Sequence, residues 1–309
     1  MRIRSFLGSS AACLVLVPAL AQAAAPQPRT FVSAKKGSDA ANCSRTSPCR
    51  TFERAIAATT PGGEVVVLDS GGYGAVTISQ AVSLEAPDGV YAGMTVSTGD
   101  GITIATGASD VVVLRGLTLV GGSASGNGIT VASGGTVRIE HCTIRGFGDF
   151  GIFATEGTFP FLYVDDSTFS ESGNVSILIT GLTAPEGFNS GVAIDHCRFE
   201  GAGLLFDAAN SLLSVSVTDT VIADARFEGI HVTGSTTATI DRCLVKDFGD
   251  FGVVAGGSNA RVFVSNSTIR SVVPQSRLPL TTGAGAFMCS FGNNAISDPV
   301  LGVTSCPTQ

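Results

Sequence analysis

Short segments in which apolar and polar residues alternate recur through residues 64–273 of this chain. Each segment covers four to six residues, is rich in Val, Ile and Thr, and is bounded by Gly, Asn, Asp or Ser. A period of two residues predicts β-strands with one buried and one exposed face. The intervals between the bounding residues are too short for a helix of useful length. The pattern therefore predicts an all-β chain.

The strand segments belong to a repeat of about 24 residues. Similar stretches are V-R-I-E-H-C-T-I at 137–144, A-I-D-H-C-R-F at 193–199 and A-T-I-D-R-C-L-V at 238–245. Aligned on one column, successive repeats are 26, 25, 30, 23, 23 and 24 residues apart; the column consists of Gly116, Cys142, Ser167, Cys197, Thr220, Cys243 and Ser267. Such a period indicates a solenoid. We predict a right-handed parallel β-helix of about eight or nine coils, roughly 40 Å long at the ~4.8 Å spacing of strands.

The open ends of a β-helix need covers, because they expose unpaired strand edges and the core. Residues 51–58, T-F-E-R-A-I-A-A, predict a capping α-helix with Thr51 as N-cap, a buried face of Phe52, Ala55 and Ile56, and an end at Pro61-Gly62-Gly63. We expect residues 24–63 to hold a first strand, a disulfide loop and this helix. Residues 64–273 would form the β-helix, and residues 274–309 a C-terminal cap or tail.

Residues 1–23 have the features of a secretory signal peptide. Arg2 and Arg4 form a basic start, residues 11–20 an apolar run, and Ala21-Gln22-Ala23 a cleavage site. The alternative is a transmembrane anchor, but the run is shorter than the ~20 residues needed and contains Pro18. No later segment is apolar and long enough to span a bilayer. We therefore expect a secreted or periplasmic protein without membrane insertion.

Seven cysteines remain after the predicted cleavage. Two local disulfides, Cys43–Cys49 and Cys289–Cys306, are the simplest pairing in an oxidising compartment. The other three, Cys142, Cys197 and Cys243, lie two coils apart, which is ~9.6 Å between neighbours and beyond the reach of a disulfide. We expect them to be buried free thiols. A metal or redox site is the alternative.

Composition and charge exclude several classes of protein. The chain of 309 residues is 44% apolar and 14% charged, which excludes disorder. Without the signal peptide it has 16 basic and 25 acidic residues, a formal charge of −9. No nucleic-acid partner is therefore expected. With no Trp and three Tyr, it offers few aromatic platforms for sugar stacking. We expect a monomer.

Acidic residues occupy equivalent positions in three successive repeats. Glu140, Asp165 and Asp195 would be vertical neighbours ~4.8 Å apart, close to the ~5 to 5.5 Å between the carboxyl groups of retaining glycosidases. One hypothesis is that they are catalytic and hold a proton or Ca²⁺ for acid/base attack on a polysaccharide that lies along the coil, contacted by His141 and His196. No cofactor is certain. The alternative is a solvated row of polar residues at a turn.

The longest repeat predicts a wall beside this row. The 30 residues between Ser167 and Cys197 include T-A-P-E-G-F-N-S at 183–190. Because a lengthened coil forms the side of a groove on a smooth solenoid, Glu186 and Phe188 are candidate substrate-binding residues.

One segment carries a family resemblance. Residues 31–78 contain a first strand, a G-S-D loop, the predicted helix and the strand P-G-G-E-V-V-V. The segment resembles the entry segment of secreted bacterial right-handed β-helix proteins of the pectate-lyase-like superfamily. The resemblance implies the fold and is poorly specific for activity. The chain lacks the N-T-D, G-H-G and R-I-K elements of polygalacturonases, and the calcium-binding aspartates near an Arg or Lys base that characterise pectate lyases.

Two functions are compatible with these features. The protein binds or acts on a polysaccharide or cell-surface glycan, as a polysaccharide lyase or glycoside hydrolase, or it is a non-catalytic secreted or surface solenoid with a binding or structural role.

Overall fold

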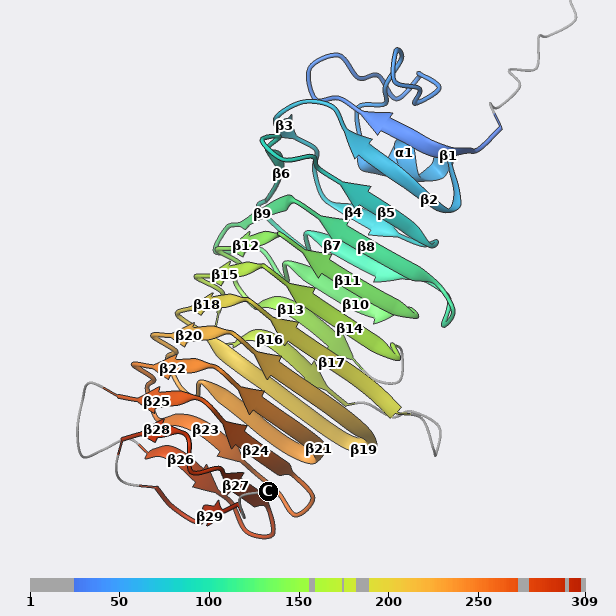
Figure 1. Ribbon diagram of the computed structural model, residues 1–309. Coiled ribbons are helices and arrows are strands. Elements are labelled where there is room, and N and C mark those ends of the chain that lie inside the picture. Colours follow the sequence, from blue (N-terminus) through green and yellow to red (C-terminus); the bar gives the residue numbers. More distant parts are fainter. Residues whose placement is uncertain are drawn as a thin grey trace, which may run out of the picture.

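The computed structural model describes residues 25–155, 159–173, 175–181, 189–271, 278–297 and 300–306. They form a right-handed parallel β-helix of about eight turns, visible in Figure 1 as one elongated stack. The predicted fold class is confirmed. The predicted signal peptide lies outside the described residues. The helix of the described part of the chain is too short to cross a membrane.

Each turn contributes strands to three stacks, named here after one member each. The β11 stack comprises β1 (Gln27–Val32), β2 (Thr59–Val67), β5 (Val82–Glu85), β8 (Val111–Arg115), β11 (Thr136–Glu140), β14 (Phe161–Asp165), β17 (Asn189–Asp195), the second halves of β19 (Gly203–Thr218) and β21 (Ile230–Asp241), β24 (Arg261–Ser265), β27 (Phe287–Ser290) and β29 (Thr304–Ser305).

The other two stacks complete the turn. The β10 stack comprises β4 (Val76–Ile78), β7 (Ile102–Ala105), β10 (Ile129–Ser133), β13 (Phe150–Thr155), β16 (Val175–Thr180), the first halves of β19 and β21, β23 (Phe251–Ala255) and β26 (Leu278–Thr282). The β12 stack comprises β3 (Gly71–Gly72), β6 (Ala92–Val96), β9 (Leu117–Gly121), β12 (Thr143–Arg145), β15 (Thr168–Ser170), β18 (Arg198–Glu200), β20 (Val221–Ala223), β22 (Leu244–Lys246), β25 (Thr268–Arg270) and β28 (Ala295–Ile296).

The core lies inside the stack, where alternate residues of every strand meet. In β11, for example, Val137 and Ile139 are fully buried while Arg138 between them is exposed. Each such side chain contributes about 1.5 to 3 kcal/mol relative to an exposed one. Outward residues at equivalent positions are thereby held in files that run along the axis of the helix.

From β8 to β24, a residue with positive φ directly follows each strand of the β11 stack, at the corner that leads to the β12 stack. His141, Asp166 and His196 have φ of 54°, 44° and 49° at this position. Gly116, with φ of 70°, occupies the same place, because Arg115 pairs with Glu140 in the sheet. The sequence alignment of Gly116 with Cys142 is therefore wrong by one residue.

The backbone conformation of Gly116 and the burial of Leu117 explain this difference. The turn needs the left-handed conformation, which glycine adopts without steric cost. Leu117, not Gly116, then fills the buried position equivalent to Cys142, since Thr118 pairs with Thr143.

The buried column at this corner alternates between thiols and hydroxyls. Cys142, Cys197 and Cys243 are free and buried. Below each of them lies a hydroxyl residue: Ser167 Oγ accepts a hydrogen bond from the Cys142 N–H at 3.0 Å and donates to the Asp165 carbonyl at 2.8 Å. The hydroxyls thus pair buried backbone groups that the tight turn leaves outside the strand ladder.

The ends of the stack carry a helix and two disulfides. The helix α1 (Phe52–Ala58) begins as predicted, with the Thr51 hydroxyl accepting from the Arg54 N–H and with Phe52, Ala55 and Ile56 buried. It ends at Ala58, as predicted for residues 51–58, and β2 runs from Thr59 through Pro61. Both predicted disulfides, Cys43–Cys49 and Cys289–Cys306, are confirmed. Parallel pairing continues past residue 273 through β26, β27 and β28.

The hydroxyls of the buried column should contribute measurably to stability. We expect Ser167→Ala to lower the free energy of unfolding by about 1 to 3 kcal/mol, because it leaves the buried Cys142 N–H without a partner. Thr168→Ala, at the neighbouring outward position, is the control and should cost less than about 0.5 kcal/mol. Urea unfolding of both variants measures the difference; equal effects would contradict this role of the column.

Candidate functional site

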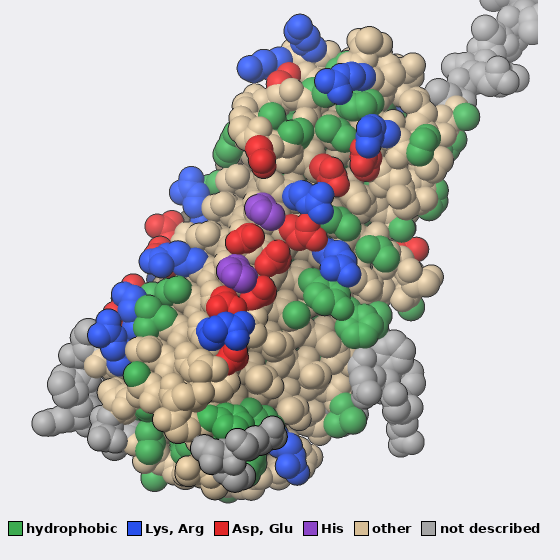
Figure 2. All heavy atoms as spheres, in the orientation of Figure 1, with side chains coloured by type: hydrophobic (Ala, Val, Ile, Leu, Met, Phe, Trp, Pro, Cys, Tyr) green, Lys and Arg blue, Asp and Glu red, His purple; other side chains and the backbone are tan. Residues whose placement is uncertain are grey.

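An acidic file runs along the corner between the β11 and β12 stacks. The register of the β11 stack aligns the last residues of successive strands, from Glu85 in β5 to Ser265 in β24; the members are Glu85, Arg115, Glu140, Asp165, Asp195, Thr218, Asp241 and Ser265. Figure 2 shows this stripe of acidic side chains, with two histidines beside it and basic side chains among the carboxylates.

Arginines neutralise the outer parts of the file. Arg115 donates to Glu140 Oε2 from Nε at 2.9 Å and from Nη2 at 2.6 Å. Arg242, in the adjacent turn position, donates to Asp219 at 2.9 and 2.6 Å and also pairs with Asp241. The hydrogen bonds from Arg242 lower the pKa of Asp219. Glu140, predicted to be catalytic, is thus engaged in an ion pair.

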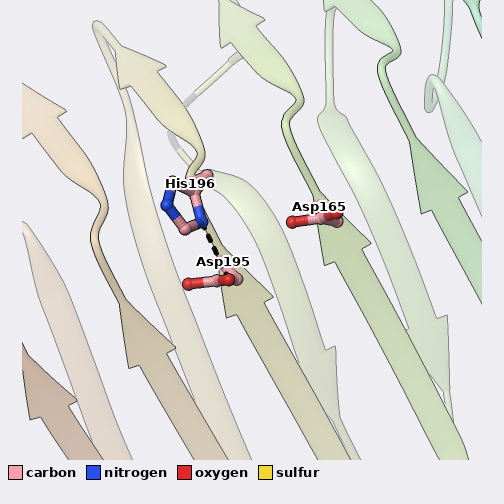
Figure 3. Close-up of side chains that lie close together, drawn as sticks. All are labelled: Asp165, Asp195 and His196. Atoms are coloured by element: carbon pink, nitrogen blue, oxygen red, sulfur yellow. Dashed lines mark hydrogen bonds and ion pairs between the residues drawn. The ribbon is translucent and has the colours of Figure 1, made fainter.

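The centre of the file is different. Asp165 forms no ion pair with a lysine or arginine of the described residues. Asp195 accepts hydrogen bonds from Thr218 Oγ1 at 2.5 Å and from His196 Nδ1 at 2.8 Å. Asp165, Asp195 and His196 each offer one atom that could bind a metal ion, and these three atoms lie within 4.8 Å of one another. Figure 3 shows the three side chains on adjacent turns. We call these three residues the central cluster.

The contacts in the central cluster shift two pKa values in opposite directions. Partial burial acts to raise the pKa of Asp195, but the hydrogen bonds from Thr218 and His196 outweigh it and lower that pKa. The same hydrogen bond to Asp195, together with its negative charge, raises the pKa of His196. Asp195 is therefore held ionised, and His196 stays protonated to a higher pH than an isolated imidazole.

The remaining candidate residues are not in the central cluster. His141 is exposed on the preceding turn, with Nε2 3.6 Å from Asp166 Oδ2. Glu186 and Phe188 lie outside the described residues.

A shallow pocket that the sequence analysis missed lies beside the central cluster. The outward face of β14 carries Phe161 and Tyr163, whose ring centroids are 6.2 Å apart, followed by Asp165. The Arg138 guanidinium lies 4.4 Å from the centroid of Tyr163. The neighbouring strands β17 and β19 present only small side chains at this level, which makes a pocket of about 250 Å³; its floor includes Gly191, Ala193, Ser214 and Ser216.

Gly191 lets the Phe161 ring pack closely over that floor. A Cβ at Gly191 would lie 3.0 Å from Phe161 Cδ1, because the aromatic ring packs over the position. Phe161 nevertheless keeps 44% of its surface exposed. The sequence signal was the alternation Phe161, Tyr163, Asp165 at outward positions of one strand.

A second pocket continues this face toward the C-terminal end of the stack. Thr237, Arg261 and Phe287 pair in register at the level of Phe161 and line a pocket of about 310 Å³. The rings of Phe287 and Phe263 are 5.9 Å apart. We call the outer face of β14 to β27, with both pockets, the trough. It crosses the strands, and its floor of small residues separates two pairs of aromatic rings.

The central cluster alone does not fit a closed calcium site. Ca²⁺ takes six to eight oxygen ligands, whereas two carboxylates and an imidazole supply fewer oxygens and one nitrogen. Waters or the carboxylates of a bound substrate would have to supply the other oxygens.

Comparison with known proteins identifies the fold. No protein-family model and no curated protein matches this chain. Among solved structures, it is similar to pectate lyase Pel9A, at 13% identity and a TM-score of 0.59, over 93% of this chain and 80% of that one. It is also similar to a rhamnogalacturonan lyase, at 10% identity and a TM-score of 0.53, over 89% and 84%. The fold is the pectate-lyase-like β-helix, as the resemblance of residues 31–78 implied.

The coupling of His196 to Asp195 predicts a titration shift. We expect Asp195→Asn to lower the pKa of His196, because the neutral amide no longer favours the charged imidazolium. NMR titration of the histidine ring measures it. Asp149→Asn, at an exposed position outside the file, is the control. An unchanged His196 titration in Asp195→Asn would show that the hydrogen bond is not formed in solution.

Proposed function

We propose that this chain is an exported protein that binds a polysaccharide along the trough, with the central cluster against the bound chain. The observation that carries the proposal is that Phe161 and Tyr163 lie on the same strand face as Asp165. Aromatic rings give sugar rings an apolar surface, and adjacent carboxylates accept hydrogen bonds from sugar hydroxyls. The names of the two similar structures, a pectate lyase and a rhamnogalacturonan lyase, also favour a polysaccharide.

The dimensions of the trough suit a linear polymer. Phe161 on β14 and Phe263 on β24 are separated by four strand spacings, which is about 19 Å. Among the described residues, the floor between them carries small residues such as Ala193 and Ser216, which leave room for a chain that crosses the strands. Several consecutive sugar rings would then contact the protein, with the aromatic pairs at the two ends of the contact.

Export is part of the proposal. The disulfides Cys43–Cys49 and Cys289–Cys306 are typical of proteins that fold in an oxidising compartment. The basic start and apolar run of residues 1–23 provide the signal for secretion to the periplasm or beyond. Polysaccharides of cell surfaces are available to a protein in either place.

Cleavage of the bound polysaccharide is the second candidate function, favoured by the asymmetry of the central cluster. Asp195 raises the pKa of His196 and so favours its protonated form, which is suited to donate a proton to a leaving glycosidic oxygen. Asp165, without an arginine or lysine partner among the described residues, is suited to accept a proton from a sugar carbon or to attack the sugar as a nucleophile. The ~4.8 Å strand spacing places the two carboxylates near the separation of retaining glycosidases.

Removing the aromatic pair should weaken binding. We expect the variant Phe161→Ala/Tyr163→Ala to lose affinity for the bound polysaccharide about tenfold or more, equivalent to about 1.4 kcal/mol. Phe227→Ala is the matched control, since Phe227 is 46% exposed and does not line the trough. Isothermal titration with soluble fragments of the polysaccharide measures both. Equal affinities of the double variant and the wild type would exclude the trough as the binding site.

Cleavage is tested separately. Neutral and acidic polysaccharides are screened for new reducing ends and for the ultraviolet absorbance of unsaturated products. Where the wild type cleaves, Asp165→Asn and Asp195→Asn should each lower kcat at least about 100-fold, whereas Asp149→Asn and Asp250→Asn should not. Binding without cleavage of any substrate would favour the non-catalytic alternative.

A further inference from the structure

The N-terminal end of this acidic protein is basic. Residues 25–58 contain six basic residues and two acidic ones; the basic residues are Arg29, Lys35, Lys36, Arg45, Arg50 and Arg54. The rest of the mature chain has ten basic and 23 acidic residues. The positive charge therefore gathers over the loop that precedes α1, at the upper end of the molecule in Figure 2.

Part of this charge lines a pocket of about 590 Å³. Lys35, Lys36 and Arg45 lie around it, together with Ser33 and Asp69. None of the three basic side chains lies within 4.0 Å of a carboxylate of the described residues, in contrast to Arg115 and Arg242 of the acidic file. They are exposed, and so their charges are available to an anionic ligand. We call this the basic pocket.

The carboxylate of the basic pocket, Asp69, is hydrogen-bonded within the protein. Asp69 accepts hydrogen bonds from Ser33 Oγ at 2.6 Å, from the Ala34 N–H at 2.7 Å and from the Tyr73 hydroxyl at 2.9 Å. Burial acts to raise the pKa of Asp69, but these hydrogen bonds lower it on balance. The carboxylate thus fixes the two chain segments at the base of the pocket and leaves the lysines and Arg45 to face outward.

The basic pocket has a rigid frame. The Cys43–Cys49 disulfide closes its loop, and the backbone bonds Ser33 N–H to Cys49 O and Cys49 N–H to Phe31 O, both 2.9 Å, fasten the loop to β1. The Arg45 guanidinium lies 5.8 Å from the centroid of the Phe31 ring. A preformed site loses less entropy on binding than a mobile loop.

The position of the basic pocket aligns it with the acidic file. Lys35 lies three residues after the end of β1. In β1, Phe31 pairs with Val66 of β2, which pairs with Glu85 of β5, the first residue of the acidic file. The same register continues along the file to Asp165. Five strand spacings, about 24 Å, separate β1 from β14. The basic pocket and the central cluster thus lie on one corner of the β-helix, within reach of one extended polymer.

We propose that the basic pocket binds carboxylates of a uronate-rich polysaccharide and anchors a chain whose continuing segment reaches the central cluster. The inference rests on the proposed function in taking the ligand to be a polysaccharide. Lysine and arginine side chains bind carboxylates by charge-assisted hydrogen bonds. A linear polysaccharide touches only a narrow strip. Between the basic pocket and Asp165 that strip holds Glu85 and Glu140, both paired with Arg115. A nucleic-acid duplex or an anionic membrane would also face the many other carboxylates of this surface.

The test uses polygalacturonate, with its fully methyl-esterified form as a neutral probe of the same backbone. We expect Lys35→Ala/Lys36→Ala/Arg45→Ala to lower the affinity of the mature protein for polygalacturonate at least about tenfold at low salt, and less at high salt because ions screen the charges. The affinity for the methyl ester should stay within about twofold. The control variant removes three exposed positive charges elsewhere, by Arg145→Ala/Arg226→Ala/Arg270→Ala, and should bind polygalacturonate like the wild type.

Three outcomes would overturn the inference. They are an equal loss of affinity in the control variant, an equal loss for the methyl ester, and tighter binding of the wild type to duplex DNA or phosphatidylglycerol vesicles than to polygalacturonate. The pocket variant retains Phe161, Tyr163 and the central cluster. Loss of polygalacturonate binding in the pocket variant but not in Phe161→Ala/Tyr163→Ala would support the basic pocket while refuting the trough, so the two proposals fail separately.

Discussion

The parallel register of successive turns is the constraint on which the rest of this structure depends. Hydrogen bonding fixes neighbouring strands ~4.8 Å apart, and it holds like residues at that distance along each file. For apolar residues inside the stack this spacing gives a continuous core. For carboxylates outside, it brings like charges together, and the chain compensates them with Arg115 and Arg242 on either side of the centre. Asp165 and Asp195 are left without such a partner among the described residues, which is why they are the residues proposed to face a bound polysaccharide.

Buried residues stabilise the corner of the β-helix that carries the acidic file. Residues such as His141 and His196 adopt the left-handed conformation there, and the column of thiols and hydroxyls beneath them binds the backbone groups of the turn. Because both layers repeat with each turn, the side chains above them have little freedom to separate. The same geometry that stabilises the solenoid therefore organises the central cluster.

Sequence periodicity predicts what repeats and misses what does not. The strand phase, the helix at residues 52–58 and the row from Glu140 to Asp195 follow from spacing alone. The sequence alignment put Gly116 in the column of Cys142, whereas it is equivalent to His141. Its position is set by the positive φ that the turn requires and not by the size of its side chain. Composition suggested few aromatic platforms, yet Phe161 and Tyr163 form one where their strand neighbours are small. The ion pair of Glu140 with Arg115 also depends on the length and conformation of the arginine side chain, which the spacing of residues in the sequence does not show.

The central claim is that a polysaccharide lies along the axis of the β-helix, over the outer face of the β11 stack. A crystal structure of the protein with an oligogalacturonate long enough to reach across eight strands of the β11 stack, from β1 to β19, tests it most directly. The account predicts continuous sugar density across β1 to β19, with a carboxylate between Lys35 and Arg45 and a sugar ring against Tyr163. Density confined to the outer face of the β10 or β12 stack would contradict it.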